Sequence, residues 1–186
     1  MRHLNPTLWR TCRVLSGRIR IRLLRQLHDR PGRNVSALAD ALGIGVSDAS
    51  QELRRLQSRG LLQAERRKAF LIYRLGADPQ VLSAAPLLKA IEQSLSSRSP
   101  ARDGEMAVIA AGLAHPRRIA VVQTLQTSPR RLYGLRTLLD IPSGTMSHHL
   151  AILRESGWIQ LQQGILTSRP PDHPLARALA RLAAAE

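Results

Sequence analysis

The chain has 186 residues and a formal net charge of +15, and 44% of its residues are hydrophobic. The single cysteine, Cys12, excludes an internal disulfide, and no apolar run approaches the roughly 20 residues of a membrane span. The first residues, Met-Arg-His-Leu-Asn-Pro, lack the apolar stretch of a signal peptide, so we expect a cytoplasmic protein with no membrane contact. The strong positive charge favours a polyanion as partner.

The N-terminal region is expected to be helical. Asn5 and Pro6 predict the cap and first turn of a helix that runs through Trp9 and Val14. Residues 18–27 start with alternating Arg and Ile, which is typical of a strand, but a longer window shows helical spacing of apolar residues. We therefore predict a second helix here.

A helix-turn-helix is predicted between Val35 and Leu62. The apolar positions fit two short helices separated by a break at Gly43–Gly45. Ser36 is expected to cap the first helix, and Gly60 to end the second in the left-handed conformation. Polar residues with no core to fill recur at helical spacing on the outer face of the second helix: Ser47, Ser50, Gln51 and Arg54.

A β-hairpin is predicted directly after this motif. Two β-favouring runs between Leu61 and Leu75 flank the charged residues Glu65-Arg66-Arg67-Lys68, which we expect to form the turn. A helix-turn-helix followed by a basic hairpin is a winged helix. The charged tip is either a simple exposed turn or a nucleic-acid contact, and the polar helix beside it favours a contact through Arg66, Arg67 and Lys68.

The same pattern occurs twice. With a shift of 97 residues, seven positions of the first half align with identical residue types in the second half. They are Leu38, Leu42, Ile44, Ser50, Leu53, Leu56 and Gly60, which align with Leu135, Leu139, Ile141, Ser147, Leu150, Leu153 and Gly157. Upstream, a shift of 98 pairs Leu15, Ile21, Leu27 and Pro31 with Leu113, Ile119, Leu125 and Pro129. One residue has therefore been gained or lost near Gly32–Asn34. We interpret the chain as a duplicated unit.

The duplication predicts two domains of about 90 residues each. A helix starting at Asp78-Pro79 ends the first domain, and residues 96–104, which lack apolar periodicity, are interpreted as a linker. We place the first domain at 1–96, the linker at 97–104 and the second domain at 105–186. The second domain is expected to have a shorter hairpin that turns at Gln163-Gly164, and a final helix at 174–185.

Two segments resemble the arsenic-resistance repressor (ArsR) family of bacterial winged-helix regulators. The first is Ser50-Gln-Glu-Leu-Arg-Arg-Leu-Gln-Ser-Arg-Gly-Leu-Leu62, and the second is Ser147-His-His-Leu-Ala-Ile-Leu-Arg-Glu-Ser-Gly-Trp-Ile159, preceded by Leu113-Ala-His-Pro-Arg-Arg-Ile119. The resemblance implies a transcriptional regulator whose second motif helix enters the major groove of double-stranded DNA. It implies the following contacts: Ser47, Ser50, Gln51, Arg54 and Arg55 in the first domain, and Ser143, Ser147 and His148 in the second.

The resemblance also bears on assembly and on metals. The family dimerises through its first and last helices, so we expect the flanking helices of the two copies to pack as an intramolecular pseudo-dimer. The predicted fold is mainly α with small β-hairpin wings, and a homodimer of chains would display four motifs. The family's metal sensors use clustered Cys and His, but here Cys12 stands alone and His148 and His149 face different sides of a helix. We therefore expect no metal, no cofactor and no catalytic residue, and no pattern identifies an effector.

The two copies differ in charge. Residues 1–98 hold 18 Lys and Arg against 7 Asp and Glu, whereas residues 99–186 hold 10 against 6. Ala151 and Ile152 also replace Arg54 and Arg55, while His149 is expected to pack in the core. The first domain should therefore dominate DNA binding. An enzyme is disfavoured because no catalytic motif occurs, and the remaining alternative is a tandem winged-helix adaptor in protein-interaction, replication or chromosome-organising complexes.

Overall fold

The computed structural model describes residues 7–185, and Asn5 and Pro6 of the expected first cap lie outside them. The first half folds into helices and a three-stranded sheet: α1 (Leu8–Leu15), α2 (Arg18–Asp29), β1 (Arg33–Asn34), α3 (Val35–Leu42), α4 (Val46–Gln57), β2 (Leu62–Arg67), β3 (Phe70–Leu75) and α5 (Ala84–Ser97). The second half repeats the order: α6 (Gly104–Gly112), α7 (Pro116–Thr127), β4 (Arg130–Arg131), α8 (Leu132–Leu139), α9 (Ser143–Glu155), β5 (Ile159–Gln162), β6 (Ile165–Ser168) and α10 (Pro174–Ala184). A short 3₁₀ helix, η1 (Pro100–Arg102), lies between them.

The predicted duplication is visible in the element bounds. α7 repeats α2 with a shift of 98 residues at both ends, and α8 repeats α3 with a shift of 97. The sheets have the same antiparallel order, β1-β3-β2 and β4-β6-β5. The extra residue therefore lies between the end of α2 and β1, where the sequence repeat placed it.

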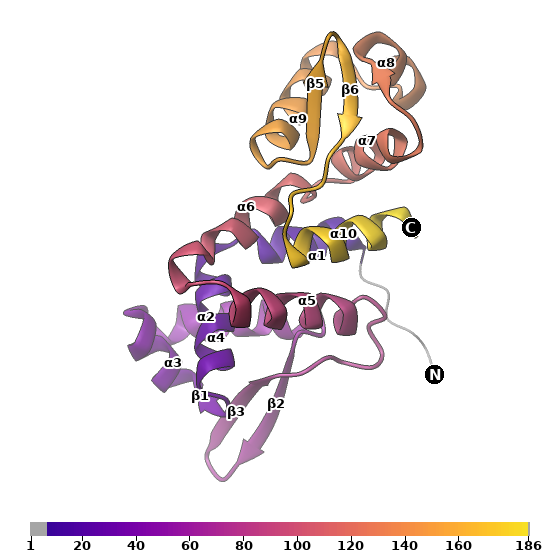
Figure 1. Ribbon diagram of the computed structural model, residues 1–186. Helices are drawn as coiled ribbons and strands as arrows, with labels where there is room; N and C mark the ends of the chain where they lie inside the picture. Colours follow the sequence, from indigo (N-terminus) through magenta and orange to yellow (C-terminus); the bar gives the residue numbers. More distant parts are fainter. Residues whose placement is uncertain (1–6, 186) are drawn as a thin grey trace.

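The flanking helices join the two copies. α1 packs on α6, α5 packs on α10, and one continuous cluster of buried apolar side chains runs through both halves. Figure 1 shows these helices as a middle layer, with one winged helix-turn-helix unit and its hairpin at each end of the molecule. No helix in the described part of the chain is long and apolar enough to cross a membrane.

Three local expectations are wrong. The side chain of Asn34 caps α3 by accepting the amide of Ala37, so Ser36 lies inside the helix. β2 continues through Arg67, which pairs with Phe70, so the first hairpin turns at Lys68-Ala69 and not over residues 65–68. The helix expected from Asp78 begins only at Ala84. Pro86 therefore lies in the first turn of the helix, where a proline is tolerated.

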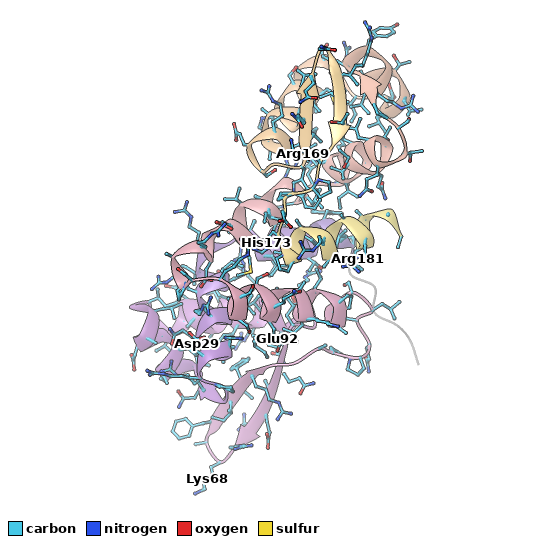
Figure 2. All side chains as sticks on the ribbon, viewed as in Figure 1. Asp29, Lys68, Glu92, Arg169, His173 and Arg181 are labelled. Atoms are coloured by element: carbon cyan, nitrogen blue, oxygen red, sulfur yellow. The ribbon has the colours of Figure 1, made fainter. Side chains whose placement is uncertain are left out.

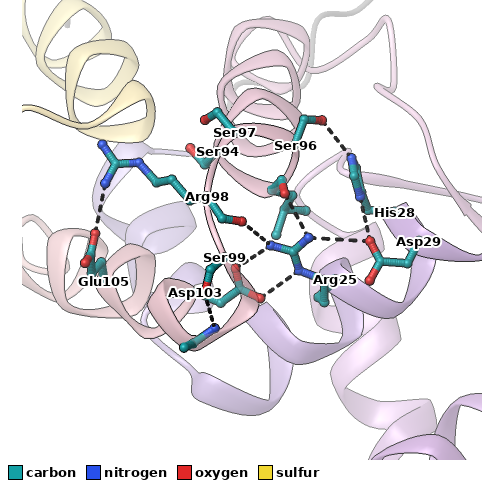
Figure 3. Close-up of polar contacts among 12 residues, drawn as sticks. Arg25, His28, Asp29, Ser94, Ser96, Ser97, Arg98, Ser99, Asp103 and Glu105 are labelled. Atoms are coloured by element: carbon teal, nitrogen blue, oxygen red, sulfur yellow. Dashed lines mark hydrogen bonds and ion pairs between the residues drawn. The ribbon is translucent and has the colours of Figure 1, made fainter.

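The expected linker is an ordered segment. Arg25, on α2, donates to both carboxylate oxygens of Asp103 at 2.8 and 2.7 Å. It also donates to the carbonyls of Leu95 at 2.8 Å and Arg98 at 3.3 Å (Figure 3). This guanidinium therefore ties the first domain to the segment that leads into the second, and the hydrogen bond to Asp103 raises the pKa of Arg25.

Candidate nucleic-acid interface

Helix α4 presents a polar face to solvent, opposite its core face. Ala49, Leu53 and Leu56 are fully buried. Ser47, Gln51 and Arg54 are exposed on the opposite side, and Ser50 is half-buried at its edge. The break before α4 depends on Gly43, which adopts the left-handed conformation at φ 66° and ends α3.

The two neighbouring arginines of α4 differ in what they contact. The side chain of Arg54 is exposed and makes no hydrogen bond or ion pair with any residue between 7 and 185, so its guanidinium is available to a ligand. Arg55 is exposed but donates to Glu52, whose other carboxylate oxygen meets Arg20 of α2. A phosphate that recruits Arg55 must therefore compete with an internal carboxylate.

Sequence reasoning missed a group of arginines along one flank of α4. They surround an open hollow of about 490 Å³, lined by Trp9, Arg10, Arg13, Val14, Arg20, Arg55 and Arg59. Arg10 lies over the Trp9 ring, 4.7 Å from its centroid. Arg10 and Arg13 are three residues apart on one helix face, but only the packing of α1 against α4 brings them beside Arg55.

The first hairpin carries charge at its outer end. Arg66, Arg67 and Lys68 are all exposed, and Lys68 lies at the tip (Figure 2). Arg67 forms an exposed ion pair with Glu65 at 3.2 Å. Lys68 has a positive φ of 55°, as expected for a residue of the tight turn between β2 and β3.

The corresponding surfaces of the second half carry fewer charges. Ser143, Ser147 and His148 are exposed on α9, but the Ser147 hydroxyl donates to the Ser143 carbonyl at 3.1 Å, within the helix. The hairpin between Ile159 and Ser168 contains no charged residue.

The comparisons with known proteins match each half to a family of regulators. Residues 15–69 match the MarR family model, and residues 115–160 match the model for bacterial regulatory proteins of the arsR family. The chain carries two winged helix-turn-helix regulator domains in tandem. Comparison with curated proteins and with solved structures gave no match.

Both families consist of DNA-binding transcriptional regulators, and the protein is a regulator of this general class. Families of such regulators are generally not enzymes. Within residues 7–185, no group of three or more His, Cys, Asp or Glu side chains is arranged to hold a metal ion.

Buried histidines distinguish the regulator's second domain. His149 is only 5% exposed, as the sequence predicted, and its ring centroid lies 4.6 Å from that of His115. Burial, followed by the positive charge of His115 and Arg118, lowers the pKa of His149 to about 4. His173 is 2% exposed, and burial likewise lowers its pKa to about 4.

Proposed function

We propose that this regulator binds DNA sequence-specifically and that its first domain makes the dominant contacts. The observation that carries the proposal is the outer face of α4, where Gln51 and Arg54 stand exposed with no core to fill. An amide can form two hydrogen bonds with an adenine edge, and a guanidinium can do so with guanine. Ser47 and Ser50 extend the same face as smaller hydrogen-bonding groups.

The basic hairpin supports this assignment. Arg66, Arg67 and Lys68 project from the same domain, so they can contact backbone or the minor groove while α4 occupies the major groove. Arg55 and the arginines of the flanking hollow add positive charge beside α4. Ser143, Ser147 and His148 are proposed as weaker contacts of the second domain.

The experiment that tests the proposal is selection of bound sequences from a random duplex pool by the full-length protein. We expect enrichment of a defined motif, and loss of most of that enrichment in Arg54→Ala. A motif with two inverted half-sites would indicate a homodimer of chains on the operator, and a single half-site would indicate one recognition helix. A pool that stays random would contradict sequence-specific binding.

A second candidate function is a protein-interaction adaptor. The observation in its favour is the exposed apolar surface of α8, where Tyr133 is 77% exposed, Leu138 56% and Leu132 43%. Several large apolar side chains exposed on one short helix favour a protein contact. The selection separates the two candidates, because an adaptor of this kind does not require a preferred DNA sequence.

A further inference from the structure

Two equivalent arginines, one in each domain, connect a helix to the end of the helix before it. We call this set of packed helices the frame of the domain. Arg118 of α7 donates to the carbonyls of Gly112 at 2.8 Å and Ala111 at 3.0 Å, at the end of α6. Arg20, which is 98 residues earlier, donates to the corresponding carbonyls at the end of α1, those of Val14 and Arg13. Each arginine therefore satisfies the last carbonyls of the helix that precedes its own.

The two arginines differ in their third partner. In the first domain, Arg20 also forms an ion pair with Glu52 of α4. The equivalent position in the second domain, 97 residues later, is His149 of α9. Arg118 is only 8% exposed, and no carboxylate among residues 7–185 forms an ion pair or hydrogen bond with it. Burial lowers the pKa of Arg118, as expected for a cation without a counter-charge.

The histidine that replaces the glutamate has unused hydrogen-bonding capacity. Neither ring nitrogen of His149 bonds to a described residue, although the side chain is 95% buried. His115 lies against it, and its Nδ1 accepts the backbone amide of Arg117 at 3.1 Å. A neutral His115 therefore carries its proton on Nε2, which leaves that atom as a donor.

Apart from the thiol of Cys12, the titratable groups that face these side chains are basic. Arg117 and Arg118 come from the first turn of α7, where the helix dipole adds positive potential, and His148 comes from α9. Arg13, from α1 of the first domain, also lowers the pKa of His115, after burial, Arg118 and Arg117. The buried thiol of Cys12, on α1, is the group that acts on Arg118 with the opposite sign.

We propose that His115, Arg118 and His149 bind an oxyanion of the phosphate class, which supplies the negative charge that the carboxylate of Glu52 supplies to Arg20 in the first domain. Arg118 supplies the charge, and the two imidazoles supply N–H donors. Arg13 and Arg117 lie at the solvent side and attract the anion. The oxyanion is either free phosphate or a backbone phosphate of DNA.

Binding should be linked to protonation. An anion beside His115 and His149 favours their charged forms and raises their pKa values toward the ordinary range. The complex therefore takes up protons below about pH 6.5, and affinity should increase as the pH falls from about 6.5 toward about 4, the pKa of the free His149. A bound oxyanion would also strengthen the contact of α7 with α9, and hence steady the second recognition helix.

The test compares the wild-type protein with His149→Glu, which supplies the carboxylate that the first domain already has. Inorganic phosphate, titrated against sodium chloride of equal ionic strength, should raise the Tm of the wild-type protein. His149→Glu should have a higher Tm without phosphate, and its phosphate affinity should be at least about tenfold weaker, since an internal carboxylate now satisfies Arg118. An equal phosphate effect on both proteins would show only the general salting effect and would overturn the proposal.

A second measurement uses the unmodified protein and does not depend on the variant folding. In NMR spectra of the histidine rings, phosphate should shift His115 and His149 and leave His173 unchanged, because His173 is equally buried but already has the carboxylate of Glu105 among the arginines around it, Arg98 foremost. Shifts produced by duplex DNA and not by phosphate would assign the oxyanion to the DNA backbone. Rings that respond to neither probe would refute the site, whatever the outcome of the DNA selection.

Discussion

The two domains share a frame and differ in the surface that each presents. The outward stripe of α4 and its C-cap reads Ser47, Gln51, Arg54 and Ser58, whereas the equivalent stripe on α9 reads Gly144, His148, Ala151 and Glu155. The stripe on α9 therefore has no arginine and carries a carboxylate, which phosphate would repel. The two copies therefore keep the same helix-turn-helix fold although the exposed side chains of the second motif helix differ.

The retained features are the ones that satisfy backbone groups. Arg20 and Arg118 cap equivalent helices, and Gly60 and Gly157 both end their recognition helices at φ values above 70°. Buried carbonyls and strained turns cost free energy in either copy, whereas an exposed arginine matters only if DNA is bound. The frame is therefore constrained by folding and the outer face by function.

The largest expected effect of a single substitution concerns a position where the contacts between the helices differ. Arg25 of the first domain makes its contacts to Asp103, Leu95 and Arg98, while the equivalent Gln123 makes a single hydrogen bond at 2.7 Å to the carbonyl of Ala183. Arg25→Ala leaves a partly buried carboxylate without its partner and should destabilise the protein by about 3 kcal/mol. Gln123→Ala should cost about 1 kcal/mol.

Chemical denaturation of the two variants checks this difference. Arg25→Lys is the matched control, because it keeps the charge and loses the bidentate geometry, and its stability should be intermediate. Equal losses in Arg25→Ala and Gln123→Ala would mean that the ion pair does not hold the segment between the domains.

The next effect tests the two recognition faces directly. Arg54→Ala should weaken specific DNA binding by about 1–3 kcal/mol, because it removes the exposed guanidinium of α4. His148→Ala, the control on α9, should change affinity by less than about 0.5 kcal/mol. Fluorescence anisotropy with the selected duplex measures both. If the histidine variant lost more affinity than the arginine variant, the assignment of the dominant domain would be reversed.

The features that depend on local periodicity could be predicted from the sequence. The exposed face of α4 and the burial of His149 follow from helical spacing, since a side chain's direction on a helix is set by its position along it. The end of the first hairpin was misplaced because Arg66 and Arg67 resemble turn residues by charge, although their backbones continue the pairing up to Phe70.

Features that depend on tertiary contacts could not be predicted. The segment around Asp103 has the composition of a flexible linker, and the arginine that orders it lies 78 residues earlier. The arginine-lined hollow likewise requires α1 to pack against α4, which the spacing of Arg10 and Arg13 does not reveal. The exchange of Glu52 for His149 was visible in the repeat, but it gained meaning only when Arg20 and Arg118 were seen in equivalent places.

Acid should affect the second domain first, because the lowered histidine pKa values of the described chain belong to it. His149 and His173 have a pKa of about 4 in the folded protein, below the ordinary 6.5. As the pH falls below about 6.5, the unfolded chain binds protons that the folded protein does not, so stability decreases until about pH 4. Each histidine contributes up to about 1.4 kcal/mol per pH unit.

Tryptophan fluorescence can locate this acid transition. In a Trp9→Phe variant, Trp158 alone reports on the second domain, where its indole donates to the Ile109 carbonyl at 2.9 Å. Its thermal transition should shift to lower temperature at pH 5 than at pH 7. A shift that is the same in His149→Glu would remove His149 as a cause.

The smallest expected effect concerns the tips of the two hairpins. Lys68 and Gln163 both have positive φ values, of 55° and 49°, but only the first is charged. Lys68→Gln therefore introduces the residue type that adopts a positive φ at the tip of the second hairpin, so the fold should be preserved. If Lys68 contacts a phosphate, the salt dependence of DNA binding should decrease by about one counterion, with little change in sequence preference. An unchanged slope of affinity against salt concentration would place the tip outside the DNA interface, and the remaining contacts would then come from Arg66, Arg67 and α4.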